Sequence, residues 1–258
     1  MIAISPALHF VRRQVLGAVL VMSGGLFPAA TSASQINLVD DDFDAGSRAD
    51  WFNSSTALGL SASTNALVST SGSPTLVRYF PLQTLAVGES LILSFTLSAT
   101  GLSDKLYGFR LGLMRSGSKR VSTDDFGATV SFADYQGYRL VTNLGSSAAS
   151  STVFQKRNDT STSSLLGGTW SKVGNSTVGV NFSSGTTYPF VLTLTRIDGA
   201  SLAMSVSING VVLLSAVDNA ATALAFDTIA VFKDSSAAES LTFDNVSLAY
   251  GKSVSPAH

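Results

Sequence analysis

Residues 188–214 constrain the fold of this chain more than any other stretch. Apolar residues alternate there with Thr, Ser and Ala in runs that are separated by an Asp-Gly pair at 198–199 and an Asn-Gly pair at 209–210. Such pairs between alternating runs are strong hairpin signals, because both central positions of the turn require a positive φ angle. The stretch therefore predicts an antiparallel meander of three strands.

Short strand-like runs also recur on both sides of this meander, bounded by Gly, Ser and Asn. They are residues 66–69, 75–82, 90–98, 107–115, 128–132, 137–143, 151–156, 177–181, 226–232 and 240–250. The Ser- and Thr-rich segment 145–176 has no sustained period beyond 151–156, so we expect a long loop there that contains Trp170. Many short strands with few helical periods predict an all-β, antiparallel two-sheet sandwich.

The alternation also predicts which side of each strand faces the core. In 107–115 the apolar residues should face inward, which leaves Gly108, Arg110 and Gly112 as a flat outer floor with one charged side chain. In the last strand the apolar phase changes at 244–245, which predicts a β-bulge.

The N-terminus has the pattern of a signal peptide. Arg12 and Arg13 precede an apolar run at 15–22, and small residues follow. The apolar run is shorter than the roughly 20 residues that a membrane span needs, so stable membrane insertion is not expected. We therefore expect a signal peptide at 1–33 and a single exported domain at 34–258, located in the periplasm, at the cell surface or in the medium.

Composition excludes several classes of function. The net charge is -1 and only 13% of residues are charged, so the chain lacks the positive field that gathers nucleic acid. Because the chain has no cysteine, its core must hold without disulfides, and thiol catalysis and zinc–thiolate sites are excluded.

Three features together resemble a known fold family. An acidic strand at 40–44, the Asn-Gly hairpin and a closing strand at 243–246 resemble the concanavalin A-like lectin/glucanase jelly roll, including the laminin-G-like domains of secreted bacterial proteins. The resemblance covers residues 38–250. It implies two stacked, curved antiparallel sheets with a concave face, which in many relatives holds sugar.

Groups that transfer protons are scarce. The two histidines are His9, inside the expected signal, and His258, the last residue, so histidine bases and histidine metal ligands are excluded from the folded body. The two glutamates, Glu89 and Glu239, are far apart in sequence, and the tight acidic motif of the glucanases of this fold is absent. The paired strand motifs of the lyases of this fold are absent too, although Arg and Tyr residues could play their roles.

We expect ligand binding through aromatic and polar side chains on the concave face. The candidates are Arg110, Tyr135, Tyr138, Arg139 and Trp170. Core packing is the alternative for each aromatic residue, and Trp51 and Phe52 are expected to be core residues.

A structural Ca²⁺ is a further expectation. The candidate ligands are Asp41, Asp42, Asp44 and Asp244, which the jelly roll would bring together where the first and last strands meet. The alternative is that these carboxylates only solvate an edge strand and prevent sheet-to-sheet aggregation.

The sequence therefore favours a secreted, non-catalytic jelly-roll domain that binds a glycan or another cell-surface polymer. A divergent polysaccharide lyase or glycoside hydrolase is the first alternative. A purely structural protein of the extracellular matrix or cell surface is the second.

Overall fold

The computed structural model describes residues 35–44, 48, 50–55, 58–61, 65–70, 72–127, 131–145, 151–158 and 164–252. All of these residues belong to one compact unit. In this part of the chain no helix is long and apolar enough to span a membrane. The expected signal segment 1–33 lies outside the described residues.

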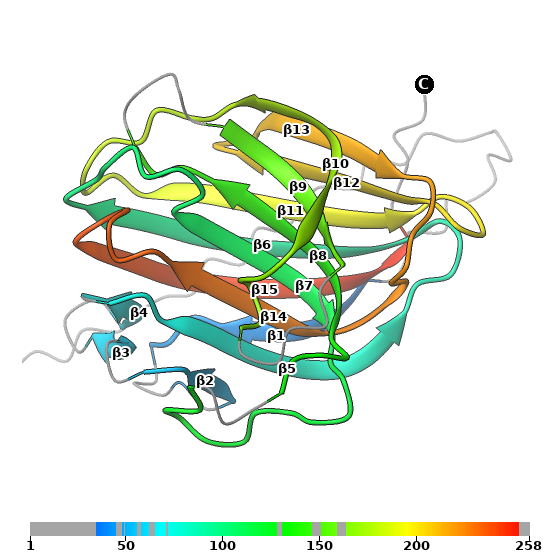
Figure 1. The fold of residues 1–258 in the computed structure, drawn as a ribbon, viewed down its shortest axis with the longest axis horizontal. Helices are drawn as coiled ribbons and strands as arrows, with labels where there is room; N and C mark the ends of the chain where they lie inside the picture. The colour runs from blue at the N-terminus through cyan, green and yellow to red at the C-terminus, as the bar shows by residue number, and fades with distance from the viewer. Residues whose placement is uncertain are drawn as a thin grey trace, which may run out of the picture. The chain divides into compact units, whose positions relative to one another are not determined.

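The described strands form two antiparallel sheets, one layered over the other (Figure 1). The neighbours in sheet A are, in order, β13 (Val211–Asp218), β12 (Leu202–Ile208), β11 (Tyr188–Arg196), β6 (Glu89–Thr100), β15 (Ser240–Lys252), β4 (Ala66–Ser69) and β3 (Leu58–Ser61), and β1 (Gln35–Asp41) also pairs with β15. Those in sheet B are β10 (Trp170–Val178), β9 (Ser151–Arg157), β8 (Gln136–Thr142), β7 (Phe109–Arg115), β14 (Ala225–Lys233), β5 (Thr75–Thr84) and β2 (Trp51–Asn53). The predicted two-sheet β-sandwich is confirmed.

The predicted meander is strands β11, β12 and β13, which pair in antiparallel register. Asn209 and Gly210 both have positive φ angles, 53° and 76°, as a two-residue hairpin turn of this kind requires. The connection between β11 and β12 is longer than the Asp-Gly pair at 198–199 suggested. A hydrogen bond of 3.0 Å from the Ile197 N–H to the Ser201 carbonyl closes it.

Aromatic rings from the two sheets meet in the core between them. Phe95 and Phe190 of sheet A stack with ring centroids 4.9 Å apart, and Phe109 of sheet B lies 6.4 Å from Phe190. Trp51 of sheet B packs edge-on against Phe243 of sheet A at 5.8 Å. Each ring is at most 2% exposed, so these contacts hold the two layers together through burial of apolar surface.

The bulge predicted in the last strand is confirmed, because the register of β15 against β6 shifts between Asp244 and Ser247. Asn245 has a positive φ angle of 51° at this point. The bulge lets apolar residues on both sides of it face the same core.

Two predictions about strands were wrong. The segment 145–176 is not one long loop, because β10 begins at Trp170 and pairs with β9. This edge strand has only one buried residue, Val173, so no apolar alternation marks it in the sequence. Residues 131–132, at the end of the run expected at 128–132, are not in a strand, and 128–130 lie outside the described residues.

Candidate functional site

The outer face of sheet B is covered by chain rather than open. A covering loop, residues 116–127 and 131–135, and a strap, residues 164–167, lie over the strands. Together with outward-facing residues of β5, β7 and β14, they form an apolar cluster that is separate from the core between the sheets. The buried members of this cluster are Val77, Met114, Val121, Phe126, Phe132, Tyr135, Leu165, Leu166 and Ala230. The centre of the face that carries the predicted ligand-binding residues Arg110 and Arg139 is therefore occupied by the protein's own side chains.

Three of the predicted ligand-binding residues lie together under the strap. The Arg139 guanidinium lies 4.2 Å from the centroid of the Trp170 ring. Arg110 and Arg139 both donate from Nη1 to the carbonyl oxygen of Leu166, at 3.0 Å for Arg110. The strap packs closely here, because a Cβ atom added to Gly112 would lie 2.9 Å from Leu166 Cδ2.

The pKa values of both arginines in this cluster are lowered. Arg139 is only 8% exposed, and burial lowers its pKa to about 9, with further lowering by the charges of Arg110 and Arg157. Burial likewise lowers the pKa of Arg110, while Asp234 acts in the opposite direction. The described part of the chain supplies no carboxylate in ion-pair contact with Arg110 or Arg139.

The other two predicted ligand-binding residues do not reach an open surface. Tyr138 faces the core between the sheets, where it is 2% exposed and donates to Asp218 Oδ2 at 2.9 Å. Successive residues of a strand point to opposite faces, so Tyr138 and Arg139 cannot share one. Tyr135 belongs to the covering loop itself, and its ring packs against the outer side of sheet B, where it is 1% exposed. The expectation that these two rings contact ligand is corrected on this geometry.

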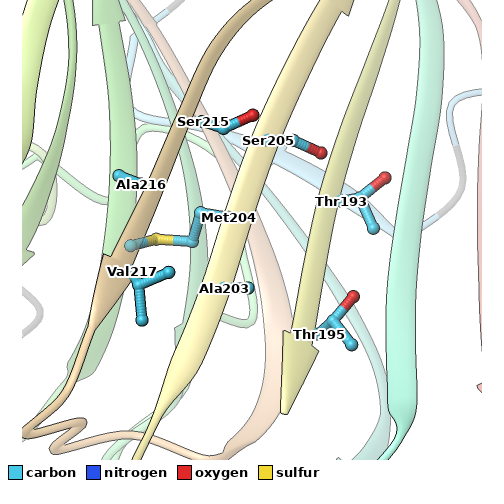
Figure 2. A pocket seen from close by; sticks show the side chains of 8 residues that line it. All are labelled: Thr193, Thr195, Ala203, Met204, Ser205, Ser215, Ala216 and Val217. Atoms are coloured by element: carbon cyan, nitrogen blue, oxygen red, sulfur yellow. The ribbon is translucent and has the colours of Figure 1, made fainter. Parts of the chain in front are cut away.

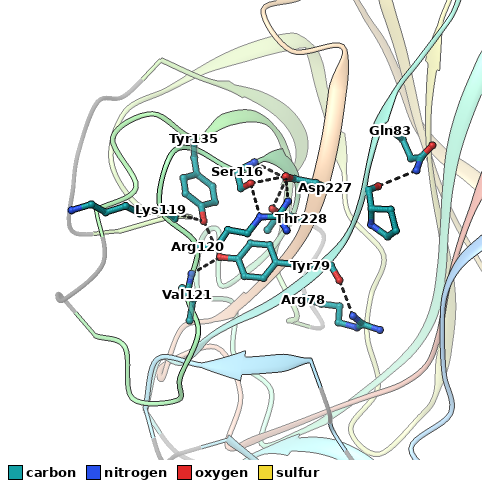
Figure 3. Close-up of polar contacts among 11 residues, drawn as sticks. Arg78, Tyr79, Gln83, Ser116, Lys119, Arg120, Val121, Tyr135, Asp227 and Thr228 are labelled. Atoms are coloured by element: carbon teal, nitrogen blue, oxygen red, sulfur yellow. Dashed lines mark hydrogen bonds and ion pairs between the residues drawn. The ribbon is translucent and has the colours of Figure 1, made fainter.

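A buried carboxylate anchors the covering loop to β14 (Figure 3). Asp227 accepts hydrogen bonds from the Ser116 N–H at 2.6 Å, from the Ser116 hydroxyl at 2.5 Å and from the Thr228 hydroxyl at 2.8 Å. It also pairs with Arg120, whose side chain is 46% exposed. The carboxylate thus fixes both the start of the loop and the position of the Arg120 guanidinium.

A chain of hydrogen bonds fixes the rest of the loop, as Figure 3 shows. The Val121 N–H donates to the Tyr79 hydroxyl at 2.8 Å, and the Tyr135 hydroxyl donates to the Lys119 carbonyl at 3.0 Å. The two hydroxyls lie 2.8 Å apart, so Tyr79 donates to Tyr135. Burial is the main cause that raises the pKa of both phenols, so neither is prepared to act as a base.

An open hollow lies between this part of the loop and the end of sheet B formed by β2 and β5. We call it the Tyr79 hollow. It measures about 470 Å³ and is lined by Asp50, Phe52, Arg78, Tyr79, Phe80, Pro81, Arg120, Val121 and Ser122. Its volume is within the usual range for small-ligand sites.

The lining of the Tyr79 hollow combines aromatic rings with charged groups. The half-buried rings of Phe52 and Tyr79 have centroids 6.3 Å apart, and the Arg120 guanidinium lies 4.9 Å from the centroid of Tyr79. Arg78 pairs with Asp50 at 3.3 Å, and the Asp50 side chain is 70% exposed. The hollow therefore offers apolar ring surface beside hydrogen-bond donors and an exposed acceptor.

Sequence reasoning missed this hollow. Phe52 was expected in the core, but it lies opposite Val77 on the outer side of sheet B, while its neighbour Trp51 faces inward as expected. The alternation of β2 was the available signal, but the strand has only three residues. Nothing local in the sequence indicates that Arg120 folds back over Tyr79.

Three further hollows lack the same combination of groups. One, of about 400 Å³ on sheet A, has neither a charged nor an aromatic residue in its lining (Figure 2). Another, of about 430 Å³, has Phe126 and Phe132 among hydroxyl groups but no charged residue. The third, of about 420 Å³, contains Arg115 and Asp134 but no aromatic residue.

The carboxylates expected to hold calcium do not form a ready metal site. Asp41 is engaged elsewhere, accepting from Trp51 Nε1 at 2.7 Å and Arg78 Nε at 3.2 Å. Burial and the nearby charges of Asp44 and Asp42 raise the pKa of Asp244. Over the described ranges, no three carboxylate or imidazole groups lie close enough together to hold a metal ion. The residues as placed do not fit a calcium ion.

No protein-family model and no curated protein sequence matches this chain. Solved structures match its fold. The metal-free carbohydrate recognition domain of Emp46p is 12% identical, with a TM-score of 0.54, over 85% of this chain and 97% of that one. Peanut lectin is 8% identical, with a TM-score of 0.52, over 86% of this chain and 100% of that one.

An enzyme shares the fold as well. An endo-1,3-beta-glucanase from Streptomyces sioyaensis is 13% identical, with a TM-score of 0.50, over 88% of this chain and 99% of that one. The chain therefore has a concanavalin A-like jelly-roll fold, as the sequence resemblance implied. At these identities the likeness concerns the fold alone.

Proposed function

We propose that this protein is a non-catalytic carbohydrate-binding protein that holds a glycan in the Tyr79 hollow. One observation carries the proposal: two half-buried aromatic rings, two guanidinium groups and an exposed carboxylate surround a single open hollow. Ligand sites of this kind pair apolar surface with a few placed polar groups. A sugar ring has both an apolar C–H face and hydroxyl groups, so it matches both parts of the lining.

Each group of the hollow has a role in this proposal. Phe52 and Tyr79 pack against the C–H face of a sugar. Arg120, fixed by Asp227, donates hydrogen bonds to sugar oxygens, and Asp50 accepts them from sugar hydroxyls. Because the loop is already anchored, little conformational entropy is lost on binding.

The charge around the hollow favours a neutral, hydroxyl-rich ligand. Arg78 contacts both Asp41 and Asp50, and Arg120 contacts Asp227, so each guanidinium already has a carboxylate partner. A neutral sugar can hydrogen-bond to such pairs without separating them. The charge balance thus supports neutral sugar residues at this position.

The comparisons support the proposal through shared architecture. A carbohydrate recognition domain and a lectin have the same fold, which supports glycan binding, and the residues of the Tyr79 hollow supply the ligand groups in this proposal. We also propose export, on the pattern of residues 1–33, which would bring the domain into contact with extracellular polymers.

The test is a glycan-array screen of the chain from residue 34, followed by calorimetric titration of the selected oligosaccharide. Ser122→Trp should block the hollow and abolish binding, while Ser118→Trp makes the same change in the same loop outside it and should have no effect. Asp50→Asn should weaken binding about fivefold, because a charged acceptor becomes a neutral one.

Three results would overturn the proposal. Unchanged affinity in Ser122→Trp would place the ligand elsewhere. Release of new reducing ends or unsaturated sugars from a polymer would favour the divergent hydrolase or lyase instead. Failure to bind any glycan, together with retention on the cell surface, would favour the structural matrix protein.

A further inference from the structure

The arginine pair beneath the strap lacks the charge balance of the Tyr79 hollow. Arg110 and Arg139 converge on one oxygen, the carbonyl of Leu166. Two guanidinium groups that donate to the same atom lie within about 6 Å of each other. Because a carbonyl oxygen carries only a partial negative charge, it cannot neutralise two full positive charges.

The other partners of the pair are also neutral. Arg139 Nε donates to Gln155 Oε1 at 2.7 Å, and Arg110 Nε donates to the Tyr107 carbonyl at 3.2 Å. The faces of the guanidiniums pack on Trp170 and on Phe232, the latter at 4.5 Å from Arg110. Asp234 acts on Arg110 but makes no ion pair with it, and the buried Arg139 has no ion-pair partner among the described residues. Arginines as buried as Arg139 are normally paired, so the arrangement has room in its charge balance for an anion.

The guanidiniums have donors left over. Nη2 of each arginine makes no hydrogen bond to any residue in the described ranges. Neither Nη2 is among the described polar atoms that are fully buried and without a hydrogen bond, so each exposes at least some surface. Arg110 itself is half-buried, which leaves a route to the pair from outside.

We infer that Arg110 and Arg139 form a binding site for an oxyanion, that is, a sulfate or phosphate ester or a carboxylate group. The anion lies beside the Leu166 carbonyl and accepts hydrogen bonds from the two Nη2 groups. The N–H donors of a planar guanidinium group match the spacing of the oxygen atoms in such anions. The site shares no residue with the Tyr79 hollow and does not depend on the function proposed for it.

The first arm of the test uses inorganic sulfate. Calorimetric titration of the chain from residue 34, at constant ionic strength with chloride as the balancing ion, should detect sulfate binding. Arg110→Gln should weaken it about tenfold, because a charge-assisted donor pair is lost. Arg115→Gln is the matched control, an exposed arginine in the same strand, and should bind sulfate as wild type does.

The second arm identifies the source of the anion. Dextran sulfate and unsulfated dextran of equal length are compared in the same titration. Binding of dextran sulfate that Arg110→Gln loses assigns the site to a substituted polysaccharide, whereas binding of free sulfate alone assigns it to a small anion. Both results support an oxyanion site.

The inference is overturned if sulfate binds no better than chloride, or if Arg110→Gln binds sulfate as tightly as Arg115→Gln does. Arg110→Gln should keep the neutral-glycan affinity of the Tyr79 hollow, and Ser122→Trp should keep sulfate binding. Failure of one site is therefore distinguishable from failure of the other.

Discussion

Replacing Asp227 with alanine should destabilise the protein, because this carboxylate ties the covering loop to sheet B. Its side chain is 4% exposed and accepts hydrogen bonds from four donor groups of Ser116, Arg120 and Thr228. In the alanine variant these donors lose their acceptor while the surrounding chain still shields most of them from water.

The size of the effect follows from how exposed each donor is. The part-buried Ser116 N–H would cost about 1–3 kcal/mol when unpaired, and the fully buried Thr228 hydroxyl about 1 kcal/mol more. Arg120 is 46% exposed and can turn to water, so its ion pair adds little. We expect a loss of about 3 kcal/mol in the free energy of unfolding.

Equilibrium unfolding in urea, followed by tryptophan fluorescence, measures this loss. Asp134→Ala is the matched control, because Asp134 is an exposed carboxylate near the end of the same covering loop and accepts from the Ser118 N–H at 2.6 Å. The control should stay within about 0.5 kcal/mol of wild type. If Asp227→Ala were as stable as Asp134→Ala, the argument that Asp227 holds the loop and positions Arg120 would be refuted.

Three other predictions concern single side chains. Tyr138→Phe should lose about 1 kcal/mol of stability, because its hydroxyl donates to Asp218 in the core, and should leave glycan affinity unchanged; reduced affinity would contradict its placement. Phe190→Ala should cost about 3–5 kcal/mol in urea unfolding, and a loss below 1 kcal/mol would argue against the packed interface between the sheets. The folded-state pKa of Asp244 is raised by burial and by Asp44 and Asp42, so its ionisation lowers stability as pH rises through that pKa. Asp244→Asn should therefore be more stable than wild type at pH 7, by less than about 1 kcal/mol, with the difference vanishing under acid conditions where wild type is protonated. Added calcium should not change this difference, and stabilisation of wild type alone by calcium would restore the metal site predicted from sequence.

The sandwich could be predicted because the sequence signals for its strands and turns lie within short stretches of the chain. The alternation of β11 and β12, the turn at Asn209-Gly210 and the bulge near Asn245 are each written within a few residues. The outward direction of Arg110 and Arg139 follows from the same period of two, as does the inward direction of Tyr138. Applied strictly to β8, that rule would have removed Tyr138 from the candidates.

The Tyr79 hollow could not be predicted in the same way. It depends on contacts between Tyr79, Arg120 and Asp227, which are far apart in the chain. Arg120 lies in the covering loop, which has no periodic pattern of apolar residues. The edge strand β10 was missed for a related reason, since only Val173 of its residues is buried. Elements held by long-range hydrogen bonds rather than by their own apolar pattern leave little local signal.

NMR chemical-shift mapping shows whether a glycan occupies the Tyr79 hollow. The ¹⁵N-labelled chain from residue 34 is titrated with the oligosaccharide that the array selects. We predict that the largest amide shifts fall at residues 50–52, 78–80 and 120–122, which line or adjoin the hollow. Largest shifts on the outer face of sheet A, around Thr193, Ser205 and Ser215, would contradict it.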